Sequence, residues 1–159
     1  MKNIIIILIT LKSLILHSQN FDDTKKVNII FTVNNEIAFN LRNFKIVDAD
    51  GNNFGKVQYV PGLLSIDKTT YEMITSESAY YLHFYDEIEI GTGNRNIYKI
   101  PINQTILNSN DFDSFFCVVA IFNRNNKEFK NRFKIVPKEN KYIYDLIFGG
   151  HSILQMIGK

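Results

Sequence analysis

The feature that most constrains the fold is a series of short β-type runs, interrupted by turn residues at intervals of roughly 8–12 residues. In the first run, Val27, Ile29, Phe31 and Val33 alternate with their neighbours along the chain. A period of two places one face of a strand on a hydrophobic core. No long amphipathic helical pattern interrupts the series. We therefore expect an all-β fold, a single antiparallel β-sandwich of about 8–10 short strands.

Two hairpins are the most clearly marked parts of this fold. The first joins residues 44–48 to residues 54–60 through a turn rich in Asp, Gly and Asn, which tolerate a positive φ. The second joins residues 114–122, which are apolar almost throughout as in a central strand, to residues 128–136. Whether residues 152–157 form a strand or a short helix stays open. Further strands are expected over residues 63–66, 69–74, 79–90, 96–102 and 142–148, and residues 37–41 are expected to form either a short strand or a coil that packs Phe39.

An immunoglobulin-like or transthyretin-like sandwich fits this spacing of strands, although the chain has no Trp and only one Cys, unlike an antibody domain. The single cysteine, Cys117, lies in an apolar run and is expected to be a small buried residue rather than a nucleophile. Residues 105–112 are expected to connect two strands, with Ile106 and Leu107 turned inward.

The first residues of the chain have the pattern of a secretory signal peptide. Lys2 is followed by an apolar run from Ile4, and the sequence becomes polar at His17. The ending is similar to that of bacterial signal peptides, and a small residue, Ser18, marks the expected cleavage position. A retained N-terminal anchor is the alternative, but the apolar run is shorter than the ~20 residues that span a bilayer. We expect residues 1–18 to be the signal peptide, residues 19–159 to be one β-sandwich domain, and the protein to be exported, periplasmic or extracellular.

The sequence shows no pattern of a catalytic, metal or cofactor site. Net charge is +2 and no basic cluster marks a nucleic-acid surface. The segment from Asp48 to Asn52 resembles a calcium loop only in part, because an EF-hand needs Gly at its sixth position, where Asn53 stands. A plain turn is the preferred interpretation. His83 and His151 are too far apart in sequence to form a known metal motif.

The best candidate for a partner-binding surface lies in the run from Ala79 to Glu87. Alternation places Tyr81, His83 and Tyr85 on one face and leaves the other face for the core. Exposed tyrosines give broad contact area at low entropic cost, which suits contact with a protein or a glycan. The alternative is that both faces of this strand are buried between layers.

Two functions are consistent with these patterns. The first is an exported, non-enzymatic β-domain that binds a protein or glycan partner at the bacterial cell envelope. The second is a small secreted hydrolase directed at glycans, with carboxylates from separate strands. Asp86, Glu87 and Glu89 are the candidate carboxylates for that alternative.

Overall fold

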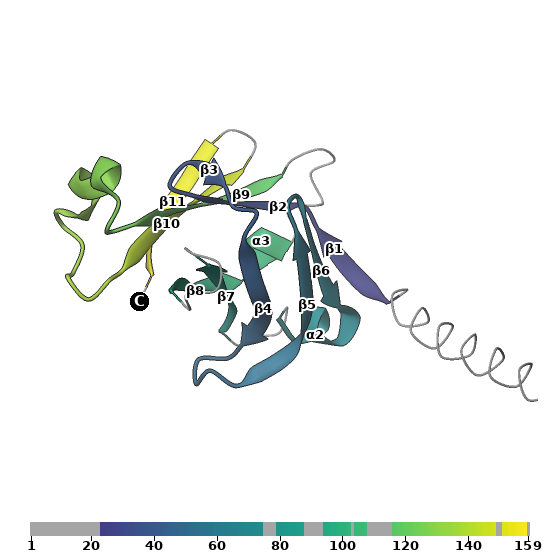
Figure 1. The fold of residues 1–159 in the computed structure, drawn as a ribbon. Helices are drawn as coiled ribbons and strands as arrows, with labels where there is room; N and C mark the ends of the chain where they lie inside the picture. Colours follow the sequence, from purple (N-terminus) through teal and green to yellow (C-terminus); the bar gives the residue numbers. More distant parts are fainter. Residues whose placement is uncertain are drawn as a thin grey trace, which may run out of the picture.

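The structure, a computed structural model, describes residues 23–74, 79–87, 94–102, 104–107, 116–148 and 151–158 (Figure 1). The expected signal peptide, residues 1–18, lies outside these ranges, as does Glu89. The described residues form eleven strands, two short α-helices and one 3-10 segment. The prediction of an all-β fold is therefore confirmed.

The strands form two sheets (Figure 1). We call the six-stranded one sheet one; its order is β1 (Thr24–Val27), β6 (Leu63–Asp67), β5 (Asn53–Val60), β4 (Leu41–Val47), β7 (Tyr80–Glu87) and β8 (Arg95–Ile102). Sheet two has the order β11 (His151–Gly158), β10 (Tyr142–Phe148), β9 (Cys117–Asn123), β2 (Ile29–Val33) and β3 (Glu36–Ile37). Neighbouring strands are antiparallel except β2 and β9, which pair in parallel with Ile29 opposite Cys117.

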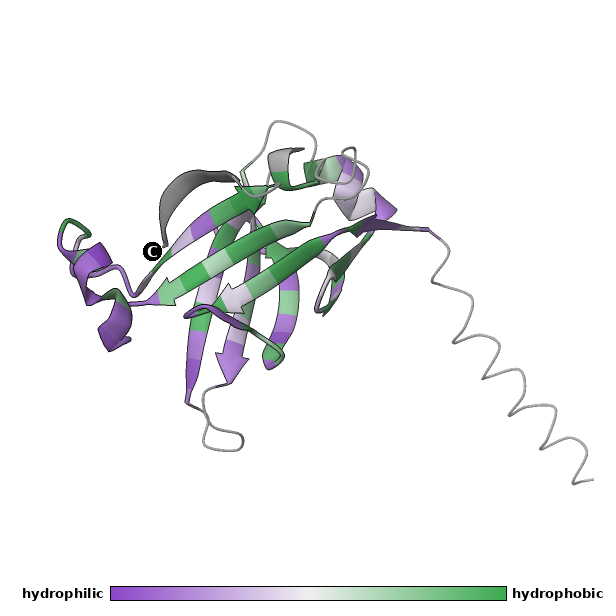
Figure 2. Cartoon of the chain, turned by 90° about the horizontal axis from the view of Figure 1, so that it is seen from above, coloured by the Kyte–Doolittle hydropathy of each residue, from purple (hydrophilic) through white to green (hydrophobic). Residues whose placement is uncertain are grey.

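The two sheets share one hydrophobic core. The alternation expected in the first run is confirmed, since Val27, Ile29 and Phe31 are all buried, and the chain passes from sheet one to sheet two at Asn28. Figure 2 shows the hydrophobic bands along the strands and the mostly hydrophilic segment that projects at the left. A continuous series of ring contacts, with centroids 4.6–5.7 Å apart, crosses the core from β5 to β10. Its members are Phe31, Phe44, Tyr59, Phe84, Tyr98 and Tyr142.

Several local expectations are also met. The first hairpin forms between β4 and β5, and Asp48 accepts hydrogen bonds from the backbone and side chain of Asn52 across the turn (2.8 and 2.9 Å). Ile106 and Leu107 are buried in the short helix α3 (Gln104–Leu107). Burial raises the pKa of the Cys117 thiol to about 12, as suits a structural cysteine.

Residues 69–74 were expected to form a strand, and this prediction is wrong. They belong to the helix α2 (Lys68–Ile74). Asp67 caps its start: one carboxylate oxygen accepts from the Thr70 N–H (2.9 Å) and the other from the Thr70 hydroxyl (2.7 Å). Thr70 and Ile74 lie one turn apart on this helix and are both buried.

Residues 128–136 were expected to return as the second strand of a hairpin, and this prediction is also wrong. Residues 127–133 form the 3-10 segment η2 (Lys127–Phe133), which Asn126 caps by accepting from the Glu128 N–H (2.9 Å). Phe129 and Phe133 pack on the face of sheet two that points away from the shared core, against residues such as Phe122. The strand that actually pairs with β9 is β10.

The C-terminal segment, left open between strand and helix, forms the strand β11 and pairs with β10. None of the helices in the described ranges is long and apolar enough to cross a lipid bilayer.

Candidate functional site

The predicted stripe lies on β7 and faces away from the shared core. Tyr80, Leu82 and Phe84 are buried, whereas Tyr81, His83 and Tyr85 are partly buried on the opposite side of the strand. The expected orientation of the strand is therefore confirmed. The partner-binding function of the stripe remains a prediction.

Cations from the two neighbouring strands surround the stripe. His83 is in register with Lys45 of β4 on one side and Lys99 of β8 on the other. The Lys99 ammonium lies 4.3 Å from the centroid of the Tyr81 ring, and the Arg95 guanidinium lies 4.8 Å from that of Tyr85. Both separations are those of cation–π pairs. We call the set of Tyr81, His83, Tyr85, Lys45, Arg95 and Lys99 the cationic face.

The positive charge of this face affects the pKa of His83. Burial lowers its pKa below the usual value of 6.5, and the positive charges of Lys45 and Lys99 lower it further. Its Nδ1 atom is buried and has no hydrogen-bond partner among the described residues. His83 is therefore neutral at pH 7 between two ammonium groups, and an anion placed beside it meets a positive potential.

The position of Lys99 is fixed from both sheets. Its ammonium donates to the backbone carbonyl of Ala49 in the β4–β5 turn (3.2 Å). Its backbone N–H donates to the Tyr142 hydroxyl of sheet two (2.7 Å), which in turn donates to the Lys99 carbonyl (2.8 Å). The edge strand that carries Arg95 and Lys99 is thus held against sheet two, and the cations need little ordering when a partner binds.

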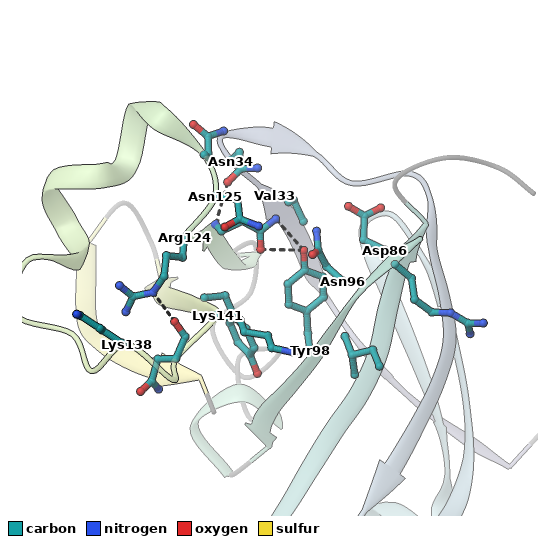
Figure 3. Close-up of a pocket in the computed structure, with 15 residues that line it drawn as sticks. Val33, Asn34, Asp86, Asn96, Tyr98, Arg124, Asn125, Lys138 and Lys141 are labelled. Carbon is teal, nitrogen blue, oxygen red and sulfur yellow. Dashed lines mark hydrogen bonds between the residues drawn. The ribbon is translucent and has the colours of Figure 1, made fainter. Parts of the chain in front are cut away.

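Sequence reasoning missed a second site, a polar cleft of about 760 Å³ at one end of the two sheets (Figure 3). We call it the amide cleft because six asparagines line it, namely Asn34, Asn96, Asn123, Asn125, Asn126 and Asn140. The side chain of Asn123 hydrogen-bonds the buried Tyr98 hydroxyl (3.1–3.2 Å). The only available signal was the number of asparagines in the turns, and those were interpreted as turn formers.

Of the carboxylates proposed for a hydrolase, Asp86 and Glu87 are not brought together, and Glu89 lies outside the described residues. Asp86 lines the amide cleft, where burial raises its pKa. Glu87 follows it on the other side of β7, in register with Arg95. A neighbouring hollow of about 500 Å³ does place Asp86 together with Glu36 and Glu128 along its lining.

Among the described residues, no three His, Cys, Asp or Glu side chains converge as a metal site. Comparison with protein-family models finds none that matches the chain. No curated protein and no solved structure shows significant similarity to it. Its function must therefore be inferred from its own residues.

Proposed function

We propose that the chain is exported and that its mature part, residues 19–159, is a single non-enzymatic β-sandwich that binds a protein or glycan partner at the bacterial cell envelope. The two sheets and their shared core support the sandwich. An immunoglobulin-like or transthyretin-like arrangement stays a prediction, and so does cleavage after Ser18. The partner contacts the cationic face, and no nucleic acid is involved.

The observation that carries this proposal is the placement of cations on the tyrosine rings. Lys99 covers Tyr81 and Arg95 covers Tyr85, so the rings hold charged groups in fixed positions at the surface. A sugar that stacks on aromatic rings needs their faces free, whereas an acidic protein surface needs fixed cations with apolar support. Tyr and Arg are also the residues most enriched at the energetic centre of protein interfaces. The geometry therefore favours an acidic protein surface over a glycan.

The test is capture of partners from the envelope fraction with the mature protein as bait. Tyr81→Ala with Tyr85→Ala, and separately Lys45→Glu with Lys99→Glu, should each remove most of the captured material. Lys130→Glu, an exposed lysine of η2 away from this face, is the matched control and should capture normally. Capture should weaken as salt rises from about 0.1 to 1 M, because screening shortens the reach of exposed charges.

Two results would overturn the proposal. One is unchanged capture by the folded face variants, which would remove the cationic face from the interaction. The other is recovery of nucleic acid with the bait. Protease treatment of the envelope fraction separates the two remaining partners, since capture that survives it identifies a glycan.

The hydrolase remains the second candidate because of one observation. Asp86 is a partly buried carboxyl with a raised pKa, and it shares a hollow with Glu36 and Glu128. A pair of carboxyls with different protonation is what glycoside hydrolysis requires. Hydrolysis of a panel of envelope polysaccharides that is lost in Asp86→Asn would establish it. Equal activity in Asp86→Asn would assign any hydrolysis to a contaminant.

A further inference from the structure

The amide cleft has the size and the built floor of a binding site. Ligand sites are typically ~300–1,000 Å³, and this cleft of about 760 Å³ lies in that range. The Tyr98 side chain is buried at its base, edge-on to the Tyr142 ring at 5.1 Å. The Asn123 N–H donates to the side chain of Asn34 (2.9 Å), so the two turns that form one wall are tied together.

The second wall is equally fixed before any ligand arrives. The Arg124 guanidinium donates to three backbone carbonyls of the loop that leads into β10, those of Asn140 (2.6 Å), Pro137 (2.6 Å) and Val136 (3.1 Å). That loop carries Lys138 and Lys141, which are exposed and line the cleft. A site on preformed walls loses little binding free energy to ordering.

Four basic residues line the cleft together with one carboxylate, that of Asp86. Figure 3 shows Arg124 and Lys138 on one side and Asp86 on the other, with Asn34, Asn96 and Tyr98 between them. No hydrogen bond or ion pair engages the Asp86 carboxylate within the part of the chain that the structure describes. The cleft thus offers cations, of which the Arg124 guanidinium is held by hydrogen bonds, together with amides that can donate and accept and a carboxylate that only accepts.

These groups select among ligand classes. A phosphate or another compact anion leaves Asp86 and most of the amides without a partner, and a cation is repelled by the four basic groups, Arg95, Arg124, Lys138 and Lys141. A neutral sugar leaves the lysines unused. A peptide needs pockets for its side chains, but among the described residues Val33 and Ile97 are the only aliphatic side chains that line this cleft. A ring with several hydroxyls and one carboxylate can use the lysines, the amides and Asp86 together.

We propose that the amide cleft binds an acidic sugar, with the sugar carboxylate on Lys138 and Lys141, ring hydroxyls on the asparagine amides, and one hydroxyl donating to Asp86. Arg95 belongs to both this cleft and the cationic face, but the contacts proposed here use Lys138, Lys141, the amides and Asp86, so the inference does not depend on the function proposed for that face. Its ligand is a small saccharide unit, whereas the cationic face is argued to take a macromolecule.

The test is calorimetric titration of the mature protein with a galacturonate trimer, beside the matched neutral galactose trimer and triglycine. The galacturonate trimer should bind saturably, and the neutral trimer at least about tenfold more weakly, since it lacks charge-assisted hydrogen bonds. Lys138→Ala with Lys141→Ala should weaken binding of the acidic trimer by about tenfold or more and leave binding of the neutral trimer unchanged. Lys130→Ala, on η2 outside this cleft, is the matched control and should bind as the unmodified protein does.

Asp86→Asn separates the two sides of the cleft. It should weaken the neutral trimer, which loses a charge-assisted hydrogen bond, and weaken the acidic trimer by a smaller factor, because the change also removes the repulsion between Asp86 and the sugar carboxylates. Equal affinity for the acidic and neutral trimers would overturn the assignment of the carboxylate to the lysines. Saturable binding of triglycine that competes with galacturonate would overturn the sugar in favour of a peptide. Absence of binding by the folded protein, with circular dichroism unchanged, would overturn the proposal altogether.

Discussion

The burial of the ion pair between Arg132 and Asp145 lets us predict how much stability is lost when either partner is replaced. Asp145 lies on the outer face of sheet two, where its side chain is 10% exposed, and Arg132 of η2 donates to its Oδ2 atom at 3.2 Å. Its Oδ1 atom is buried without a hydrogen-bond partner in the described residues. Burial raises the pKa of Asp145 even though the Arg132 charge opposes that rise. One cation, Arg132, therefore offsets the cost of burying the Asp145 carboxylate.

We expect the two partners to respond differently to removal. Arg132→Leu keeps apolar contact with the Phe122 ring but leaves a buried charge, which should lower the free energy of unfolding by about 1–3 kcal/mol. The larger loss of ~3–5 kcal/mol seen for fully buried pairs is not expected, because the Arg132 side chain is 41% exposed and water can approach. Asp145→Asn removes the charge and keeps an acceptor for Arg132, so it should change stability by less than about 1 kcal/mol.

Urea unfolding followed by circular dichroism measures both losses. The double variant should be more stable than Arg132→Leu alone, since no charge is then buried. The loss in Arg132→Leu should also shrink as the pH falls into the acid range, because burial raises the pKa of Asp145 and the buried group becomes neutral once it is protonated. A larger loss in Asp145→Asn than in Arg132→Leu, or additive losses in the double variant, would refute this reasoning.

Two further predictions concern backbone space and protonation. A Cβ on Gly55 would overlap the Thr70 hydroxyl oxygen and lie 2.7 Å from the Thr70 Cβ, so Gly55→Ala should lower the free energy of unfolding by about 3 kcal/mol. Gly51→Ala is the comparison: Gly51 lies in open space at a φ of +90°, and this change should lower the free energy of unfolding by only about 1 kcal/mol. Equal losses in urea unfolding would contradict the close approach of α2 to β5. Folding lowers the pKa of His83, so as the pH falls the unfolded chain binds a proton at this histidine before the folded protein does. The free energy of unfolding should therefore fall between about pH 7 and 5 more steeply than it does in His83→Gln. An equal pH dependence of unfolding in the two proteins would be inconsistent with a lowered pKa.

The strands were largely predictable because alternation is a local property. The inward side chains of β7 and the outward stripe at Tyr81 and Tyr85 followed from a period of two. The error at Phe129 and Phe133 arose because residues four apart lie on one face of an alternating strand, so this pattern gave no sign of a 3-10 segment. The cap at Asn126 favours the turn, and an apolar face of sheet two is there to receive the rings.

The candidate sites were predictable only in part, because they depend on contacts between distant segments. The stripe could be located, but its cations could not. Lys45 reaches its place beside His83 through a bulge after Arg42, where Asn43 has a φ of +55°. Local patterns do not fix that register. The amide cleft depends on the parallel pairing that brings the turn after β2 next to the turn after β9.

The parallel pairing of β2 with β9 also governs the order in which the molecule can assemble. The hairpins of sheet one join strands that follow closely along the chain, so each can close soon after its residues are made. The first strand of sheet two, β2, pairs locally with the short β3 along one edge, but its other edge must wait for residues 117–123. Closure over such a span is slow, and until then β2 has an unpaired, apolar edge that can pair with another chain. The segment from residue 117 onward therefore protects the beginning of the chain from aggregation, and chains truncated before residue 117 should aggregate rather than fold.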